Sequence, residues 1–115
     1  MFSDGKVVSN SHFTLRFVSE SVEGVAQVKA AFLVRKNFGN AVQRNRIKRI
    51  MREIYRINKQ DVVIFSSNKK LDVNLAFLVR TSGISGLTFT QVEAAMKELM
   101  LKVIQFHEIH SDSSH

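Results

Sequence analysis

The sequence predicts an α+β domain in which one sheet is covered by helices. Three observations lead to this fold class. Polar and apolar residues alternate in three separate stretches, which is the pattern of strands with one buried face. Two other stretches repeat apolar residues every three or four positions, as amphipathic helices do. The 115 residues suit one domain, and with 44% hydrophobic residues the chain is too apolar for a disordered basic tail.

The alternating stretches define the expected strands. The first spans residues 7–18, the second spans residues 28–34 and the third runs from residue 73 to about residue 80. We expect the first two strands to pair as a hairpin across a loop at residues 20–24. A turn-rich break at residues 81–86 follows the third strand. Together with the helices, this order favours one sheet of the α+β or split βαβ kind.

The best-defined element is a helix over residues 41–58. Asn40 has the chemistry of an N-cap, and Gln43 completes a capping box three residues later. Residues 61–65 form an apolar run that either ends this helix or adds a strand, and the polar residues 66–70 predict a loop. The apolar stripe of the helix comprises Ile47, Ile50, Met51 and Ile54.

A last helix is predicted from a second capping box, in which Thr90 is the N-cap and Glu93 its partner. The helix runs to about Phe106. We expect residues 107–115 to form a frayed polar tail behind a single domain of residues 1–106. The apolar stripe comprises Val92, Met96, Leu99, Met100 and Val103.

Positive charge is concentrated in one window of the chain. The whole sequence has a formal net charge of +7, whereas residues 29–56 alone hold nine Lys or Arg against one acid, Glu53. A concentrated basic surface attracts polyanions and releases their counterions on contact, as nucleic-acid-binding proteins do. A membrane-surface helix is the competing use of such a window, but Arg suits forked phosphate contacts and no Phe or Trp stands among the charges of the helix.

The basic helix is the candidate binding element. Cations three and four positions apart repel one another, so they indicate binding of a polyanion more than a solvated face. RNA is favoured over DNA because no short second helix precedes this one across a tight turn, as a helix-turn-helix requires. Asn45 can contact a base edge or a sugar hydroxyl. The residues left outside the apolar stripe are Arg44, Asn45, Lys48, Arg49, Arg52 and Arg56.

Four phenylalanines of the expected strands have two possible uses. They either pack in the core, which we favour, or offer stacking surfaces to single-stranded bases. These residues are Phe13, Phe17, Phe32 and Phe77.

A catalytic site of the protein's own is not expected. The ten acidic residues are scattered, and no Gly-rich phosphate loop or Ser-His-Asp set has a recognisable context. His107 and His110 stand three residues apart, which is compatible with a shared metal but also with a plain solvated terminus. A stand-alone nuclease therefore remains only as a weak alternative.

The composition also indicates a cellular setting. The chain has no cysteine, no apolar run near the roughly 18 residues of a membrane helix and no signal-peptide pattern at its start. A reducing, cytoplasmic location and no membrane partner are the simplest expectations.

One stretch closely resembles a known family signature. Residues 39–53 read Gly-Asn-Ala-Val-Gln-Arg-Asn-Arg-Ile-Lys-Arg-Ile-Met-Arg-Glu, which is similar to the signature helix of the bacterial ribonuclease P protein component. Around it, residues 13–16, 35–39 and 77–80 resemble strand segments of that family. Residues 2–6 resemble the end of the family's first helix, so we expect most of that helix to be missing from this chain.

The resemblance implies both fold and function. The fold is a single sheet of about four strands, ribosomal protein S5 domain 2-like, with a left-handed βαβ crossover through the basic helix. The function is that of the small cofactor of a ribozyme that removes the 5′ leader from precursor tRNA. Catalysis then belongs to the RNA and to Mg²⁺ held mainly by the RNA and the substrate. The alternative is a general RNA- or DNA-binding module with no processing role.

The resemblance also implies partners and site residues. The partners are the catalytic ribonuclease P RNA and precursor tRNA, with no obligatory protein partner. The expected contacts to the catalytic RNA are Arg44, Asn45, Arg46, Lys48, Arg49 and Arg52, to which the basic window adds Arg35, Lys36 and Arg56. The expected leader contacts are Phe2, Arg16, Lys36, Asn37 and Arg80.

Overall fold

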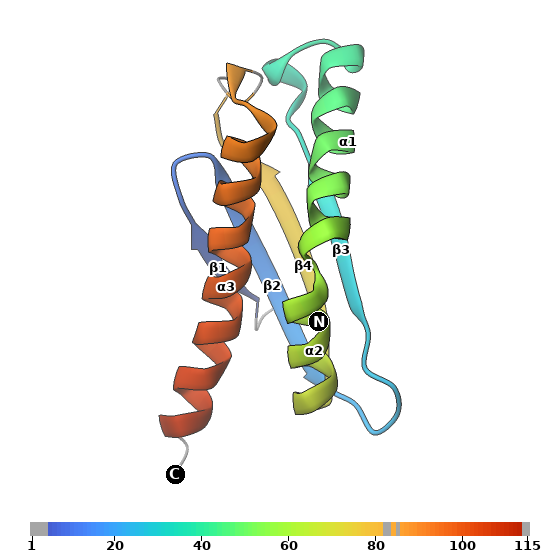
Figure 1. Cartoon of the computed structure of the whole chain (residues 1–115), viewed down its shortest axis with the longest axis vertical. Helices are drawn as coiled ribbons and strands as arrows, with labels where there is room; N and C mark the ends of the chain where they lie inside the picture. Colours follow the sequence, from blue (N-terminus) through green and yellow to red (C-terminus); the bar gives the residue numbers. More distant parts are fainter. Residues whose placement is uncertain (1–4, 82–83, 85, 114–115) are drawn as a thin grey trace.

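The computed structural model describes residues 5–81, 84 and 86–113, with side chains up to residue 108. On one face of a four-stranded sheet, two consecutive helices lie end to end and the last helix of the chain runs alongside them (Figure 1). The strands are β1 (Lys6–Ser9), β2 (Phe13–Ser21), β3 (Val28–Leu33) and β4 (Leu71–Val79). The helices are α1 (Ala41–Asn58), α2 (Gln60–Lys69) and α3 (Phe89–Ser113), with a short 3₁₀ helix, η1 (Lys36–Phe38), before α1. The predicted α+β class is confirmed.

The sheet has the order β1-β2-β4-β3. β2 pairs antiparallel with β1 and β4, and β3 pairs parallel with β4. The expected hairpin between residues 7–18 and 28–34 is therefore wrong, because β4 lies between β2 and β3. β4 buries one face in the core and keeps the other half-buried or exposed, so the centre of the sheet suits this apolar strand. The path from β3 through α1 and α2 to β4 is a crossover between parallel neighbours, whose left hand stays a prediction.

The expected first strand is divided in two by a turn. The carbonyl of the Asn10 side chain accepts hydrogen bonds from the backbone N–H of His12 (3.1 Å) and of Phe13 (2.9 Å). This Asx-type turn reverses the chain, so that β1 and β2 form the hairpin that residues 7–18 were expected to fill as one strand. β2 then continues to Ser21, beyond the expected start of the loop.

The helix at 41–58 begins and ends as predicted. The Asn40 side chain accepts from the Gln43 N–H at 2.9 Å, and the Gln43 side chain accepts from the Asn40 N–H at 2.9 Å, so the capping box is confirmed. Ile47, Met51 and Ile54 are buried against the sheet.

Residues 60–69 are helical, so both the extra strand and the loop considered there are wrong. Val62, Phe65 and Ser66 are buried, at spacings of three and four that match a helix. Burial against the core overrides the β-propensity of this valine- and isoleucine-rich run. The helix ends at Lys70, whose left-handed backbone (φ 54°) lets its N–H reach the carbonyls of the last turn.

α3 is capped two residues earlier than expected and is longer than expected. Thr88 and Gln91 form the capping box, with backbone-to-side-chain distances of 2.9 and 3.2 Å. Glu93 instead accepts a hydrogen bond from the Asn58 side chain at 2.7 Å, which ties α3 to α1. The helix continues to Ser113, so its expected end at Phe106 is wrong. Residues 107–113 are helical where a frayed tail was expected. Residues 82, 83 and 85 of the expected break, and 114–115, lie outside the described residues.

The core lies between the sheet and the helices. β2 and β4 supply its buried side chains on the sheet side, and all three helices supply those on the other side. The buried side chains without measurable exposure are Phe13, Leu15, Met51, Ile54, Val73, Phe77, Val79, Met96, Leu99 and Val103.

We expect the backbone before α1 to require glycine at position 39. Its φ of 142° is rarely adopted by residues with a side chain, and an added Cβ would lie 2.6 Å from the Gln43 side-chain oxygen. Gly39→Ala should therefore strain the backbone and disrupt the capping box, lowering the free energy of unfolding by about 1–3 kcal/mol in urea unfolding. Gly24→Ala is the control, because nothing lies within 4 Å of its added Cβ. Equal stability of the two variants would contradict this role.

Candidate nucleic-acid interface

The surface of α1 is dominated by cations without acidic partners. In the described part of the chain, no carboxylate forms an ion pair with Arg44, Arg46, Lys48, Arg49 or Arg52. The exception on α1 is Arg56, which lies 2.6 Å from the Glu53 carboxylate. Its hydrogen bond lowers the pKa of Glu53 and raises the pKa of Arg56. Arg56 is therefore less available to a phosphate than the five other cations.

The cations of α1 occupy three different parts of the helix surface. Arg44 and Lys48 are half-buried and lie in line with Tyr55, whose ring contacts Phe32 of β3 at 5.9 Å. These two cations therefore lie on the side of α1 that faces β3. The predicted contacts Asn45, Arg49 and Arg52 are exposed on the outer surface, and Arg46 is exposed on the opposite side, in line with Glu53.

The two cations expected just before α1 are also exposed. Arg35 follows β3, and Lys36 begins η1. Because η1 leads directly into α1, both lie close to the first turn of the basic helix (Figure 1). They extend its positive surface.

The sheet face away from the helices carries two of the expected leader contacts. Strand register places Arg16 of β2 opposite Ala76 of β4, on the side not covered by helices. Arg80 follows β4 and donates a hydrogen bond from its guanidinium to the Asn10 carbonyl at 2.7 Å. Four residues along the strand separate the two positions, which corresponds to about 13 Å. Asn37, like Lys36, is exposed in η1, and Phe2 lies outside the described residues.

Lys29 belongs to this same face and was missed as a site residue. A shallow hollow of about 260 Å³ on the open face is lined by Arg16, Lys29, Asn74 and Ala76, among others. The alternation in the second strand already places Lys29 opposite to the core side. What the sequence pattern lacks is the pairing of β3 with β4, which brings Lys29 into the row next to Arg16.

The phenylalanines of the strands are core residues. Phe13, Phe17 and Phe77 are 0–2% exposed, which confirms the favoured interpretation. Phe32 is partly buried and stacks on Phe77 with ring centroids 5.8 Å apart. Base stacking on the three buried rings is therefore excluded in this fold.

His107 is half-buried and packs against β2 and α2 rather than standing in a solvated tail. One ring nitrogen lies 2.7 Å from the Ser19 hydroxyl, and the other lies 2.8 Å from the Val103 carbonyl. The ring also contacts Phe17 and Phe65. The position of the His110 side chain lies outside the described part of the structure.

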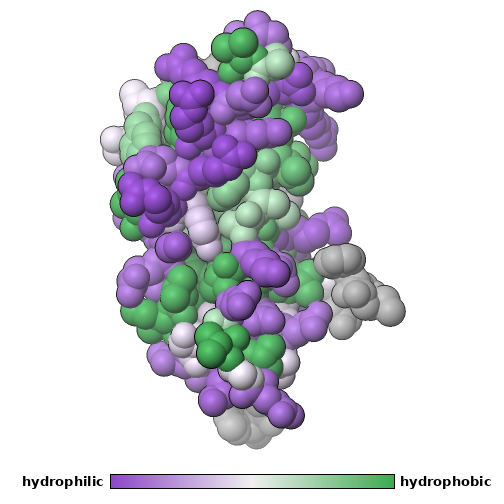
Figure 2. Space-filling model, turned by 90° about the vertical axis from the view of Figure 1, so that its right-hand side faces the viewer, coloured by the Kyte–Doolittle hydropathy of each residue, from purple (hydrophilic) through white to green (hydrophobic). Residues whose placement is uncertain are grey.

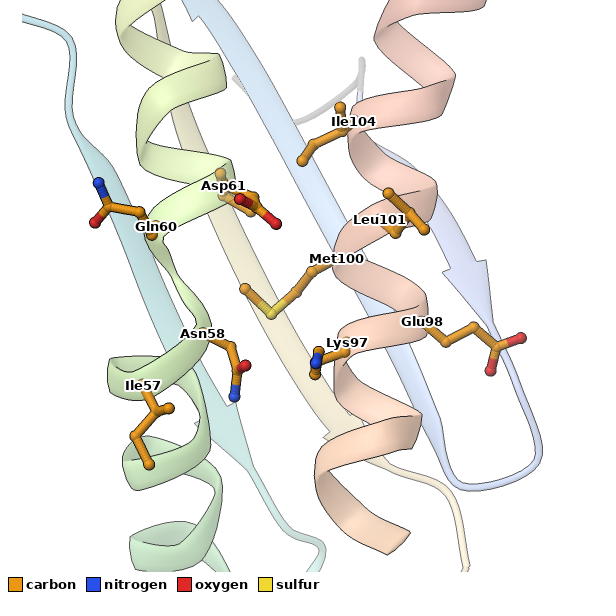
Figure 3. Close-up of a pocket in the computed structure, with 10 residues that line it drawn as sticks. Ile57, Asn58, Gln60, Asp61, Lys97, Glu98, Met100, Leu101 and Ile104 are labelled. Atoms are coloured by element: carbon orange, nitrogen blue, oxygen red, sulfur yellow. The ribbon is translucent and has the colours of Figure 1, made fainter. Parts of the chain in front are cut away.

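A separate groove of about 410 Å³ lies between the α1–α2 junction and α3 (Figure 3). Asp61 and Glu98 offset Lys97 on its rim, so the groove does not extend the basic surface. Its lining residues are Ile57, Asn58, Gln60, Asp61, Val62, Lys97, Glu98, Met100, Leu101 and Ile104.

Known proteins similar to this chain belong to one family. The family model for ribonuclease P matches residues 1–104. This chain belongs to the ribonuclease P family. A ribonuclease P protein component from Syntrophus aciditrophicus (strain SB) is 36% identical over 90 residues, which are 73% of each chain. One from Finegoldia magna is 34% identical over 102 residues, covering 89% of this chain and 80% of the relative.

Solved ribonuclease P proteins share the fold. The protein from Thermotoga maritima superposes with a TM-score of 0.70 at 25% identity, covering 86% of this chain and 84% of that chain. A Staphylococcus aureus ribonuclease P protein has a TM-score of 0.65 at 24% identity, covering 89% of this chain and 83% of that chain. The resemblance in residues 39–53 is thus confirmed as a family relationship over nearly the whole chain.

Proposed function

We propose that this chain supports 5′ maturation of tRNA by setting the cations of α1 against phosphates of the catalytic RNA. Family membership makes the chain a protein component of ribonuclease P, an endoribonuclease that processes tRNA 5′ ends. The observation that carries the binding mode is the set of five α1 cations without acidic partners among the described residues. Neutralising RNA phosphates near the cleavage site would lower the magnesium concentration that the RNA needs.

The proposal assigns the chemistry to the RNA subunit. Among the described residues, no three His, Asp or Glu side chains lie close enough together to hold a metal ion. The charge that α1 contributes is positive, which suits phosphate binding and not Mg²⁺ coordination. Mg²⁺ would accordingly be held mainly by the RNA and the substrate.

The proposal assigns the 5′ leader of precursor tRNA to the open face of the sheet. Arg16 and Lys29 flank the hollow on that face, and Arg80, Lys36 and Asn37 lie toward the ends of β4 and β3. Arginine and lysine here can neutralise leader phosphates while the small Ala31 and Ala76 leave room for the chain. Such contacts would favour precursor over mature tRNA.

The partners in this proposal are the catalytic RNA and precursor tRNA, in the cytoplasm. In the described part of the chain, no helix combines the length and apolar composition needed to cross a bilayer.

Binding of the catalytic RNA should depend steeply on salt. If five or six cations meet phosphates, the logarithm of the association constant should fall with the logarithm of salt concentration at a slope of roughly −4 to −5. A filter-binding titration of a bacterial ribonuclease P RNA at several salt concentrations measures this slope. A flat dependence would contradict phosphate contacts by α1.

Arg16→Gln should weaken the binding of precursor tRNA but not that of mature tRNA. Losing one contact to a phosphate, worth about 1 kcal/mol, should lower the affinity of the reconstituted enzyme for precursor tRNA about fivefold. Affinity for mature tRNA, which lacks the leader, should not change. Lys97→Gln, on the rim of the groove between the α1–α2 junction and α3, is the control with the same loss of charge. An equal loss of affinity for precursor and mature tRNA would contradict binding of the leader to the open face of the sheet.

A further inference from the structure

The turn between β1 and β2 is joined to two other elements through one residue, Asn10. The side-chain amide of Asn10 donates hydrogen bonds to the Ala95 carbonyl (2.9 Å) and to the Glu98 carboxylate (3.0 Å), both on α3. Its backbone carbonyl accepts a hydrogen bond from the Arg80 guanidinium at 2.7 Å. Figure 1 shows this turn beside α3, at the end of the sheet where β4 finishes. We call these contacts the Asn10 joint.

The turn also fixes the direction of the Asn10 backbone carbonyl. The side-chain oxygen of Asn10 accepts from the backbone N–H groups of His12 and Phe13, and its own backbone N–H donates to the Phe13 carbonyl at 3.0 Å. An asparagine side chain suits this position because it offers an acceptor to the turn and two donors to α3. Asn10 thus uses every polar group of its side chain inside the protein.

Arg80 is held by the same turn at two points. Its backbone N–H donates to the His12 carbonyl at 2.8 Å, one residue beyond the paired part of β2 and β4. Its guanidinium donates one N–H to the Asn10 carbonyl. No described residue accepts a hydrogen bond from the other guanidinium N–H groups or forms an ion pair with them. Because Arg80 is exposed, these groups can reach an anion from solution.

Restraint of an exposed arginine changes how well it binds an anion. An unrestrained arginine loses rotamer freedom when it contacts a phosphate, and this ordering costs roughly two- to tenfold in affinity. The bond to Asn10 orients the Arg80 guanidinium before RNA arrives. Part of the ordering has therefore already taken place in the unbound protein.

We propose that Asn10 is a positioning residue for the 5′ leader of precursor tRNA, which acts by orienting the Arg80 guanidinium on the open face of the sheet. Alternation along β4 places Arg80 on the same face as Ala76, the residue that pairs with Arg16. The inference rests on the proposed function, which assigns Arg80 to the leader. It adds a residue that acts through another one instead of contacting the RNA.

The Asn10 joint is distinct from the cations of α1. It lies on the β1–β2 side of a sheet whose other edge is β3. Figure 2 views the molecule from the side of α1 and β3, and hydrophilic side chains gather over its upper part, where α1 begins. Asn10→Ala removes no charge, so its binding of the catalytic RNA without substrate should stay within about twofold of the unaltered protein. A loss as large as that for precursor tRNA would contradict a role confined to the leader.

The motion of Arg80 tests the joint without RNA. The Nε–H signal of Arg80 is identified by its absence from the spectrum of Arg80→Gln, and ¹⁵N relaxation measures its order parameter. Asn10→Ala should lower this order parameter by about a third or more, toward the range of flexible groups. Asn10→Ser keeps an acceptor for the turn and should show a smaller decrease. Asn68→Ala on α2 is the control, and an Arg80 signal that is unchanged in Asn10→Ala would overturn the proposal.

A double-mutant cycle connects the joint to the leader. In the reconstituted enzyme, Asn10→Ala should weaken binding of precursor tRNA about threefold and Arg80→Gln about fivefold, with mature tRNA unaffected. If Asn10 acts through Arg80, the double variant should bind precursor tRNA within about 1.5-fold of Arg80→Gln alone. A merely structural role of Asn10 would instead make the two losses multiply, to about fifteenfold.

The two levels of the proposal fail differently. If the unaltered enzyme does not bind precursor tRNA more tightly than mature tRNA, the assignment of the leader to the open face is wrong, and the role of Asn10 falls with it. If that preference is present but the two losses multiply, or Arg80→Gln causes no loss, only the positioning role of Asn10 is wrong.

Discussion

Replacing Arg44, Lys48 and Arg52 together by alanine should reduce the affinity for the catalytic RNA by on the order of 100- to 1,000-fold. Each lost hydrogen bond from a charged side chain to a phosphate is worth about 1–1.5 kcal/mol, and three such losses give this range. The salt slope should become shallower by about 2–3. Quantitative binding of the ribonuclease P RNA across several salt concentrations measures both effects.

The fold should tolerate this triple change. None of the three residues belongs to the buried stripe of α1, and their removal relieves repulsion between like charges. Alanine at Lys69, Lys97 and Lys102 of α2 and α3 removes the same charge and is the control, with an expected loss of affinity below about tenfold. A loss of cooperative unfolding in the first variant would show that these side chains are part of the core.

Phe77→Ala should remove about 3–5 kcal/mol of stability, a large share of the 5–15 kcal/mol typical of a domain. The ring has no measurable exposure and stacks on Phe32, so its loss leaves a cavity at the centre of the sheet. Chemical unfolding followed by circular dichroism measures the change.

Phe77→Leu separates packing from RNA stacking. Leucine refills much of the volume, so we expect a loss of only about 1–2 kcal/mol. The folded variant should bind RNA as tightly as the unaltered protein, because the ring lies beneath the helices. A folded Phe77→Leu protein that binds RNA poorly would contradict the assignment of Phe77 to the core.

Local signals predicted local structure well. The helix 41–58 carries an N-cap, a capping partner and a regular apolar stripe, and all three act within a few residues of one another. The same logic misplaced the start of α3, because Thr88–Gln91 and Thr90–Glu93 both satisfy the capping pattern. The structure distinguishes them, because Thr88 and Gln91 bond to each other whereas Glu93 bonds to Asn58.

Non-local features could not be predicted in this way. Alternation predicts a strand but does not name its neighbour, so the place of β4 between β2 and β3 was missed. The helical state of residues 60–69 depends on burial of Val62 and Phe65 against other elements. The β-branched residues of this segment favour a strand, so its local sequence does not predict the helix.

The candidate site shows the same division. The cations of α1 were evident from spacing, because a buried stripe determines which residues remain outside. Three other features depend on side-chain geometry or strand pairing: Arg56 pairs with Glu53, Lys29 lies across β4 from Arg16 at the same hollow, and Tyr55 packs on Phe32. Residues of the basic window thus differ in what surrounds them: Arg56 is paired with an acid, Lys29 lies on the open sheet face, and Tyr55 packs on β3.

The most direct test of the cofactor role is cleavage of a precursor tRNA at low magnesium concentration in three parallel reactions. One contains a bacterial ribonuclease P RNA alone, one contains this protein alone, and one contains both. We expect 5′ leader removal only in the combined reaction, because α1 supplies the positive charge that magnesium otherwise provides. Cleavage by the protein alone would contradict catalysis by RNA. Tight RNA binding without any stimulation of cleavage would contradict the processing role and leave a general RNA-binding module.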